Sequence, residues 1–548
     1  MLLTVILLLC AGCSGDAQGD VSKPTDAPSS GDSTGPTPTS VTGDTGIERG
    51  LQVLEALVVA PTNARQRLSM IVVLRTNEPT TASLVLSDGA TTRDVVFPAV
   101  GVEHRLPVLG LPPGTHDVEY IVEAVDGSEL GGRVSVTIEP VDDLVLPQVD
   151  ITGDPGATEP GYTLMGMWTD RHGRLAAYDA TGALAWLVDL PGVPKAASLA
   201  DHGRAGVLVD RIASVRDVSG DLPTTYGPEW GASVVVRDLF HHELLLQPDG
   251  SFWSLETESR QVDEFPVDPS DLTVYAPATI GDDLVVHYAA DGTLLGEWSM
   301  VDLLDSRRVG FNSYDEGPEG LDWGHANALA LLDDGDRFVV SVRHQDALVA
   351  VDAKKNAVDW ILANPDGWSP ALEALRLQPV GEVSWPYHSH GAKIVGDMIY
   401  VFDNGNERRT TPYSDDPEPG SLYSRLVAYR IDPAARTVEQ AWEIVDADRM
   451  FSRAMGNAQP LAVTGHVLGT YPYQNGFDGI TNRDAGRGEY ATRILELDPA
   501  DGSQVWAMTL WSVYEDASKG WLVDRAMRIP SLYTGIATET VRTTTDGG

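Results

Sequence analysis

Cysteine is almost absent from this chain, and basic residues are scarce. The only two cysteines among 548 residues are Cys10 and Cys13, so the body of the chain has no disulfide framework, cysteine zinc site or catalytic thiol. With 38 Lys and Arg against 80 Asp and Glu, the formal net charge is −42. That balance argues against nucleic acid as a partner, because phosphates need Lys and Arg. A local arginine can still bind a small anion.

The chain opens with an apolar run, Leu2–Leu9, that is too short to span a membrane and is typical of a signal-peptide core. It ends in Ala11-Gly12-Cys13, which resembles a bacterial lipobox with Cys13 as the lipidated residue, although Cys10 stands where Leu is usual. We expect residues 1–13 to be a lipoprotein-type signal peptide. The pattern predicts an exported protein that faces the periplasm or the cell exterior, and it favours a lipid anchor in a membrane over free release. Which membrane face carries the anchor stays open.

Two regions of different composition follow. Residues 14–50 are rich in Ser, Thr, Gly, Asp and Pro without an apolar period, which predicts a disordered tether. Residues 51–145 contain short alternating runs such as Val118–Ala124, separated by turn signals such as Leu111–Gly114. This pattern predicts a small β-sandwich of immunoglobulin or fibronectin type.

A weak repeat occupies the rest of the chain. Each copy is an apolar strand, a tight turn and a second strand with a tryptophan, which is a hairpin pattern; the tryptophans are Trp186, Trp298, Trp360, Trp442 and Trp506. The first step is long enough for one more copy, expected around Trp253. Repeated units of this length predict a six-bladed β-propeller over residues 150–535, within an all-β chain. Helical patterns are scarce, and the one candidate, 370–375, reads as an insertion.

Histidines begin three expected inner strands of that propeller. His242, His325 and His390 have similar places in the repeat, and Arg343 follows on the next strand, so we expect all four near the central channel. Histidine is the commonest metal ligand, but an arginine repels a cation and no carboxylate or third ligand has a tight metal spacing. We therefore expect no metal and no cofactor. An arginine suits a tetrahedral oxyanion, which it holds with two parallel hydrogen bonds.

The motifs around these residues resemble the bacterial aryl-sulfate sulfotransferase family. The family's Asp-Trp-x-His-x-Asn segment matches Asp322–Asn327, and its Ser-x-Arg matches Ser341–Arg343. Its His-x-Ala and Phe-Asp-Asn-Gly segments match His390–Ala392 and Phe402–Gly405, and its His-His-Asp/Glu matches His241–Glu243. Gly391 stands where the family often has an acidic or polar residue, and the family's usual cysteine pair is missing.

The resemblance implies a role for each matched residue. His390 would be the nucleophile that takes the sulfuryl group, and His325, Arg343 and His242 would hold sulfate oxygens or assist proton transfer. Asn327 would bind the substrate. Two rivals stay open: His388 lies two residues before His390 and shares its expected strand face, and His241 adjoins His242.

The implied activity moves a sulfuryl group from a phenolic sulfate ester to a phenol through a sulfo-histidine, with ping-pong kinetics. No Gly-x-x-x-x-Gly-Lys loop is present, which argues against a nucleotide sulfate donor. A non-catalytic propeller that binds a ligand or a protein, and an aryl-sulfate hydrolase, remain alternatives. The sequence leaves the natural donor, the natural acceptor and the oligomeric state open.

Overall fold

Strands make up almost all of the regular structure. The computed structural model describes residues 50–199, 204–217, 223–228, 233–238, 240–408, 422–477, 480–481, 488–513 and 518–543. In these ranges the α-helices are α1 (Met300–Leu303) and α2 (Pro370–Glu373), of four residues each, and α2 lies at the predicted insertion. No helix in the described ranges is long and apolar enough to cross a membrane. The all-β prediction is confirmed. The predicted signal peptide, Cys13 and the tether up to residue 49 lie outside the described residues.

The first sheet contains the strands predicted for residues 51–145. They are β1 (Val53–Val59), β3 (Ser69–Ser87), β4 (Thr91–Leu109), β5 (Gly114–Ala124) and β6 (Glu129–Ile138), in the order β4-β3-β5-β6 with β1 on β3. Along β5 buried and more exposed residues alternate from Val118 to Ala124, which is the period-2 pattern that marked the region. The sixth strand, β38 (Thr538–Thr543), comes from the other end of the chain and pairs with β4.

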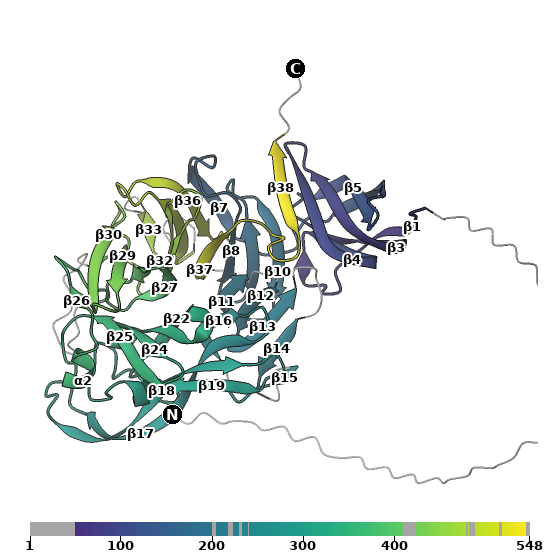
Figure 1. The fold of residues 1–548 in the computed structure, drawn as a ribbon. Helices are drawn as coiled ribbons and strands as arrows, with labels where there is room; N and C mark the ends of the chain where they lie inside the picture. Colours follow the sequence, from purple (N-terminus) through teal and green to yellow (C-terminus); the bar gives the residue numbers. More distant parts are fainter. Residues whose placement is uncertain are drawn as a thin grey trace, which may run out of the picture. The chain divides into compact units, whose positions relative to one another are not determined.

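Six further sheets, mainly antiparallel, contain most of the remaining strands (Figure 1). The first has the order β37 (Leu522–Ile529), β8 (Tyr162–Trp168), β9 (Gly173–Tyr178), β10 (Leu184–Leu190), β2 (Gln66–Arg67). The second is β11 (Pro194–Leu199), β12 (Arg204–Val209), β13 (Ile212–Asp217), β14 (Thr224–Gly227), β15 (Val234–Val235). The third is β16 (His241–Leu246), β17 (Phe252–Pro266), β18 (Tyr275–Tyr288), β21 (Gly320–Leu321), β20 (Glu316–Gly317), with β19 (Leu294–Ser299) also on β18.

The other three sheets follow the same plan. The fourth is β22 (Ala326–Leu332), β23 (Arg337–Val342), β24 (Ala347–Asp352), β25 (Ala357–Ala363). The fifth is β27 (His390–Val395), β28 (Met398–Asp403), β29 (Arg425–Asp432), β30 (Thr437–Ile444), β26 (Gln378–Pro379). The sixth is β31 (Asn457–Pro460), β32 (Val467–Gln474), β35 (Ala491–Leu497), β36 (Gln504–Trp511), β7 (Gln148–Gly153), and β33 (Gly476–Phe477) pairs separately with β34 (Ile480–Thr481).

The first strands of these six sheets are neighbours. β37 contacts β11, and the contacts continue in order through β16, β22, β27 and β31, which contacts β37 again. The starts of β16, β22 and β27 carry the histidines of the sequence motifs, so the fold brings residues far apart in sequence to one place. The strand that begins this series, β37, comes from the C-terminal end of the chain.

The repeated tryptophans lie on corresponding strands, β10, β19, β25, β30 and β36. Two of them connect neighbouring sheets: Trp298 Nε1 donates to the carbonyl of Ala353 at 3.0 Å, and Trp506 Nε1 donates to that of Ala180 at 2.8 Å. The expected extra copy at Trp253 is wrong, because Trp253 lies on β17 in the same sheet as Trp298. The long first step instead contains the sheet β11–β15.

The C-terminal segment is also bound to the first sheet. The hydroxyl of Tyr533 accepts a hydrogen bond from the backbone N–H of Leu109 at 2.8 Å. Arg93 and Glu539 form a buried ion pair at 3.2 Å, with both side chains 5% exposed.

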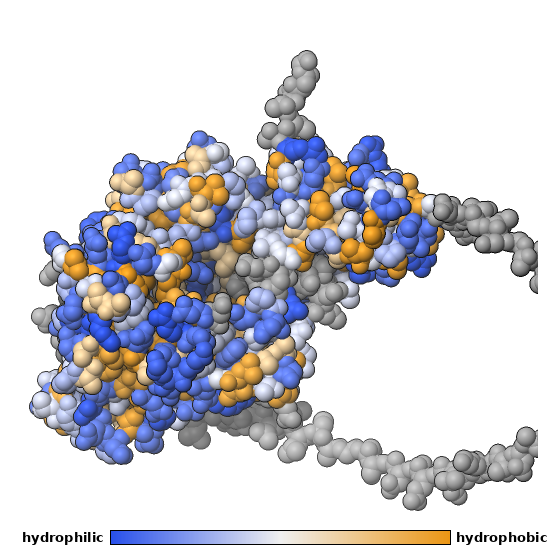
Figure 2. Space-filling model, viewed as in Figure 1, coloured by the Kyte–Doolittle hydropathy of each residue, from blue (hydrophilic) through white to orange (hydrophobic). Residues whose placement is uncertain are grey.

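The described surface is mostly hydrophilic on the face shown in Figure 2, with apolar residues in small groups, as the acidic composition leads one to expect.

Candidate active site

Bulges at the starts of three strands position the motif residues. His241, Ala326 and His390 are the first paired residues of β16, β22 and β27, and a break in register follows each of them. A bulge leaves residues out of the ladder and changes the direction of their side chains. The expectation that His242, His325 and His390 are equivalent is therefore wrong in register: His325 precedes the first pair, His390 belongs to it, and His242 follows it.

Three of the site histidines have an unusual backbone. His242, His325 and His388 each have φ of +54°, in the left-handed region that non-glycine residues seldom occupy. Such conformations cost energy and cluster at functional sites. The same rare geometry at three neighbouring histidines marks the ends of these strands as a candidate site.

The His390 ring has a defined proton arrangement. Its Nδ1 lies 2.7 Å from Oδ1 of Asn404, whose amide nitrogen donates to the carbonyls of Ser452 at 2.7 Å and Met455 at 2.9 Å. Because the amide N–H groups are used in this way, Oδ1 must accept from Nδ1–H of His390. In the neutral ring Nε2 then keeps its lone pair, and Nε2 has no hydrogen-bond partner among the described residues.

The surroundings of His390 keep its ring neutral. Burial lowers the pKa of His390 well below its usual value, and the nearby Arg343, His325 and Arg525 lower that pKa further, while the bond to Asn404 opposes them. Asn327 contacts the residue before His390: its amide nitrogen donates to the carbonyl of Ser389 at 2.9 Å. It therefore supports the residue before His390, and a contact of Asn327 with substrate stays a prediction.

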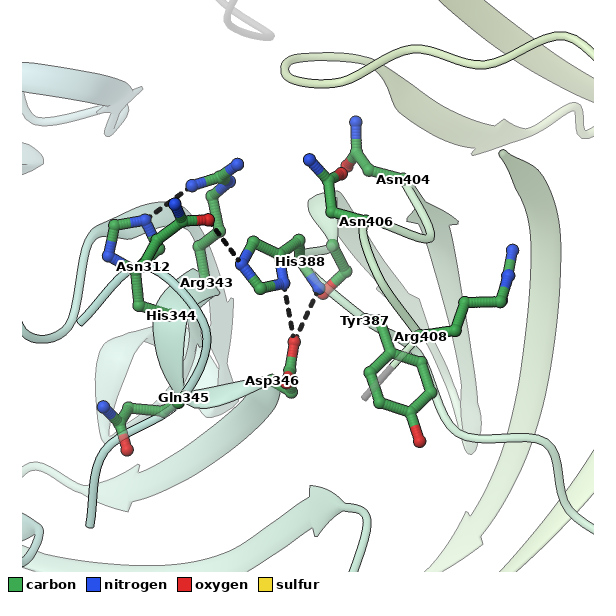
Figure 3. Close-up of polar contacts among 12 residues, drawn as sticks. Asn312, Arg343, His344, Gln345, Asp346, Tyr387, His388, Asn404, Asn406 and Arg408 are labelled. Atoms are coloured by element: carbon green, nitrogen blue, oxygen red, sulfur yellow. Dashed lines mark hydrogen bonds and ion pairs between the residues drawn. The ribbon is translucent and has the colours of Figure 1, made fainter. Parts of the chain in front are cut away.

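His388 has a different environment, which Figure 3 shows. Its Nδ1 lies 3.0 Å and its backbone N–H 2.8 Å from Oδ1 of Asp346, and its Nε2 lies 3.2 Å from Oδ1 of Asn312. Both ring nitrogens thus face oxygen atoms, and the side chain is fully buried. Of the two rivals, His390 is the one with a ring nitrogen that has no hydrogen-bond partner among the described residues.

Arg343 contacts the next residue in the chain. Its Nη1 donates to Nε2 of His344 at 2.5 Å (Figure 3). Nδ1 of His344 lies 2.6 Å from the carbonyl of Asp322. His344 is therefore neutral, with its proton on Nδ1, and burial lowers its pKa well below the usual value. Burial also lowers the pKa of Arg343 to about 10. The buried Nε of Arg343 has no hydrogen-bond partner among the described residues.

His325 and His242 face one another with ring centroids 5.0 Å apart. Nδ1 of His325 lies 2.6 Å from a carboxylate oxygen of Asp322. Nδ1 of His242 lies 2.9 Å from Nδ1 of His241. Burial lowers the pKa of His242 well below its usual value, and His325, His241, His390 and Arg525 add to that effect. Residues from β16, β22 and β27 therefore form one electrostatic cluster.

Arg525 is a site residue that the sequence analysis missed. It lies in a register break of β37, contacts Glu243 as an ion pair, and donates through Nη2 to the carbonyl of Asn327. The carboxylate of Glu243 raises the pKa of Arg525 in spite of its burial. The signal in the sequence was the pair Asp524-Arg525 in a strand whose only other charged residue is Arg528, since period-2 alternation does not place two charges side by side.

One group in the cluster has a metal-like spacing. Ligand atoms of Asp322, His325 and His344 all lie within 4.8 Å of one another. Nδ1 of His344 is held by a backbone carbonyl, its Nε2 accepts from Arg343, and Nδ1 of His325 is bonded to Asp322. Both nitrogens of His344 are thus in use, and the guanidinium of Arg343 is bonded to one of them, so these residues do not fit a cation.

The model of the arylsulfotransferase (ASST) family matches residues 151–519, which include His242, His325, Arg343 and His390. The chain belongs to the arylsulfotransferase family. The arylsulfate sulfotransferase AssT of Escherichia coli O6:H1 is 33% identical over 146 residues, or 23% of each chain. AssT of Lelliottia amnigena is 31% identical over 140 residues, or 22% of each chain. The aligned part thus spans less than a quarter of these relatives.

Among solved structures, a protein of unknown function from Bacteroides caccae covers 67% of this chain and 98% of its own, with 9% identity and a TM-score of 0.34. A TM-score at this level carries no argument about function. Membership of the arylsulfotransferase family rests on the family model, and Arg525 lies outside the range that this model matches.

Proposed function

We propose that this arylsulfotransferase-family protein transfers a sulfuryl group from a phenolic sulfate ester to a phenol, without a nucleotide donor. The observation that carries the proposal is the His390 ring, whose proton Asn404 fixes at Nδ1 while Nε2 keeps a lone pair. A neutral imidazole nitrogen is a competent nucleophile. The family match supports the same chemistry.

In the first step Nε2 of His390 attacks the sulfur of the donor, the bond between sulfur and the phenolic oxygen breaks, and the phenolate leaves. Sulfuryl transfer resembles phosphoryl transfer, in which positioning and cationic stabilisation of the outer oxygens supply most of the catalysis. Arg343, with its unpartnered Nε, binds those oxygens. In the second step the oxygen of an acceptor phenol attacks the sulfur, the bond to Nε2 breaks, and His390 is restored.

Protons move in these steps, because a basic leaving phenolate such as that of phenyl sulfate gains one and the acceptor phenol loses one. His242 and His325 are the candidates, since each has one nitrogen bonded to a defined partner and Nε2 without a partner among the described residues. Asn327 keeps the segment before His390 in place. The roles of these residues form part of the proposal.

The finer features of fold and location are proposals of the same kind. We interpret the six sheets as blades of a six-bladed propeller, because their first strands contact one another in a continuous series. The sheet of residues 53–138 is interpreted as a small β-sandwich, since β3 and β4 are long enough, at 19 residues each, to serve two layers. Residues 1–13 would direct export with a lipid on Cys13, and 14–50 would form the tether; both donor and acceptor would be phenolic compounds outside the cytoplasm.

The experiment is intact-mass measurement after incubation with p-nitrophenyl sulfate and no acceptor. The protein should gain one sulfuryl group on the peptide that contains His390, and added phenol should remove it. His390→Asn should lose the adduct and at least about a thousandfold in rate, or about 4 kcal/mol, whereas His388→Asn should lose much less. Equal turnover without phenol would identify a hydrolase, and no turnover at all would identify a binding protein. An adduct on His388 would exchange the two roles.

A further inference from the structure

A series of polar contacts leads from His242 into the third sheet. Nδ1 of His242 lies 2.9 Å from Nδ1 of His241, and Nε2 of His241 lies 2.8 Å from Oγ1 of Thr257 on β17. Thr257 pairs in the ladder with Asp283 on β18, and its hydroxyl lies 3.5 Å from Oδ1 of that carboxylate. Nε2 of His241 is itself 3.7 Å from the same oxygen. The path therefore ends at Asp283.

The far end of this path is fixed. Oδ2 of Asp283 accepts the backbone N–H of Ala326 at 2.8 Å, and the side chain is only 5% exposed. Only Oδ1 then faces Thr257 and His241. Every atom between this oxygen and His242 can both donate and accept, because a hydroxyl does so at one atom and a neutral imidazole does so at its two nitrogens.

The path consequently has two complete proton arrangements. When Asp283 is ionised, Thr257 donates to it, His241 donates from Nε2 to Thr257, and His242 donates from Nδ1 to His241, so Nε2 of His242 has a lone pair. When Asp283 is protonated, each of these bonds reverses direction, and Nε2 of His242 has a proton. Each contact along the path itself keeps a hydrogen bond in either arrangement.

We infer that Asp283, acting through Thr257 and His241, stores the proton that His242 exchanges with the two phenols. This inference rests on the proposed function. In the donor step the proton on Nε2 of His242 moves to the leaving phenolate, and protons shift along the path until Asp283 is ionised. In the acceptor step the phenol gives its proton to Nε2 of His242 as its oxygen bonds to sulfur, and the shift in the opposite direction protonates Asp283 again. Atoms and charge balance over the cycle.

The electrostatics of the path agree with this division of roles. Burial raises the pKa of Asp283 to about 8, although the hydrogen bond from the backbone N–H of Ala326 lowers it. The negative charges of Asp322 and Asp282 raise this pKa further. Burial lowers the pKa of His241 to about 4. The proton therefore rests on the carboxyl at neutral pH, and the two rings conduct it without holding the charge.

The groups facing this path come from four segments. Besides its members, they are Asp282 on β18, Asp322 and His325 before β22, and Arg211 and Glu319, which line a cavity of about 150 Å³ together with His241, His242, Thr257 and Asp283. A polar cavity of this size holds water. It gives Asp283 a route for proton exchange with solvent.

The test uses Thr257→Val, which removes the hydroxyl and keeps the shape, Thr257→Ser, which keeps the hydroxyl, and Asp283→Asn. The matched control is Thr279→Val on β18, whose hydroxyl bonds only Gln261 among the described residues. Two donors are compared in single turnovers: p-nitrophenyl sulfate, whose phenolate leaves without a proton, and phenyl sulfate, whose phenolate needs one. Transfer to phenol is measured separately, from the adduct on His390 that phenyl sulfate has formed, because only that donor leaves Asp283 ionised and able to take up the proton of the phenol.

In Thr257→Val the rate of the phenyl sulfate step and the rate of transfer to phenol should each fall by at least about tenfold. This loss is smaller than the full effect of general acid–base catalysis, because the variant interrupts only the supply of the proton. With p-nitrophenyl sulfate the rate of Thr257→Val should stay within about twofold of that of the unaltered protein. Thr257→Ser, which keeps the hydroxyl, should have the rates of the unaltered protein in all three measurements. In the unaltered protein the phenyl sulfate step should decline above about pH 8, and Asp283→Asn should abolish that decline. The control should behave as the unaltered protein.

Equal losses with both donors, or no loss in Thr257→Val, would overturn the inference. So would a decline above pH 8 that persists in Asp283→Asn. If the unaltered protein forms no adduct on His390, the proposed function fails first, and the proton path fails with it. If the adduct forms normally but the variants change the rates with both donors to the same extent, only the proton path is refuted and the proposed function stands.

Discussion

The bond between His390 and Asn404 offers the most direct test of the site. Asn404→Ala removes the oxygen that accepts from Nδ1–H of His390 at 2.7 Å. While the ring is neutral this bond contributes about 1 kcal/mol, but once Nε2 bears a sulfuryl group the ring becomes cationic and the bond is worth about 1.5–3 kcal/mol. The variant therefore loses about 1–2 kcal/mol of transition-state stabilisation. Because the ring proton is no longer fixed at Nδ1, the activation free energy rises by about 1 kcal/mol more. We expect the donor step to slow by about thirtyfold to a hundredfold.

The measurement is the single-turnover release of p-nitrophenolate. The substitution also leaves the carbonyl of Met455 without its donor and that of Ser452 with only the longer bond from the hydroxyl of Ser424, so stability should fall by about 1–3 kcal/mol and must be measured in parallel by urea unfolding. Asn404→Asp shares that stability loss but keeps an oxygen acceptor at Nδ1, so its donor step should exceed that of Asn404→Ala by at least about fivefold. The matched control is Asn364→Ala, a buried asparagine that bonds the backbone of Asp366.

A donor step within about threefold of the unaltered rate in folded Asn404→Ala would refute the reasoning. The same conclusion would follow if Asn404→Asp were as slow as Asn404→Ala, because the acceptor oxygen would then be irrelevant. A comparable loss in Asn364→Ala would show that any buried asparagine has this effect.

Four further predictions concern other parts of the chain. Arg343→Lys keeps the charge but cannot make paired planar contacts, so the rate should fall by about thirtyfold, or about 2 kcal/mol, with the fold intact; an unchanged rate would remove Arg343 from the site. Because the pKa of Asp283 is raised on folding, its contribution to stability is complete below about pH 4 and is lost as pH rises through about 8. In urea unfolding Asp283→Asn should therefore gain stability relative to the unaltered protein by about 1 kcal/mol or more between pH 5 and pH 9, and a constant difference would contradict the raised pKa. Glu539→Gln removes the carboxylate that neutralises the buried Arg93 and should cost about 3 kcal/mol in unfolding experiments; a loss below about 1 kcal/mol would contradict the view that this ion pair holds β38 to β4. Cys13→Ser should move the protein from the membrane fraction to the soluble fraction, and unchanged fractionation would exclude the lipid anchor.

The sequence predicted the elements that depend on local pattern. Alternation such as that of Val118–Ala124 gave strands, because one face of a sheet is buried at period 2. The tryptophan hairpins gave the repeated unit, and five tryptophans do lie on corresponding strands. The copy expected at Trp253 was wrong, since a long two-stranded hairpin such as β17–β18 has the same local pattern as the start of a new sheet.

The motifs also located the candidate site, because histidine and arginine at strand ends are visible without a fold. Their exact relation was not visible: bulges after His241, Ala326 and His390 shift the register, and no residue type announces them. Arg525 was missed because its partner Glu243 is 282 residues away in the chain.

By itself the sequence determined the all-β class, the repeated hairpin and the set of histidine and arginine motifs, since each depends on the order of residues along a short stretch. Only the tertiary structure decided which ring nitrogen of His390 is free, because that depends on Asn404 and on two carbonyls 48 and 51 residues beyond it. It likewise decided that His388 has both ring nitrogens close to oxygen atoms and that a series of polar contacts joins His242 to Asp283. Proton positions follow from partners in space, and sequence distance does not encode them.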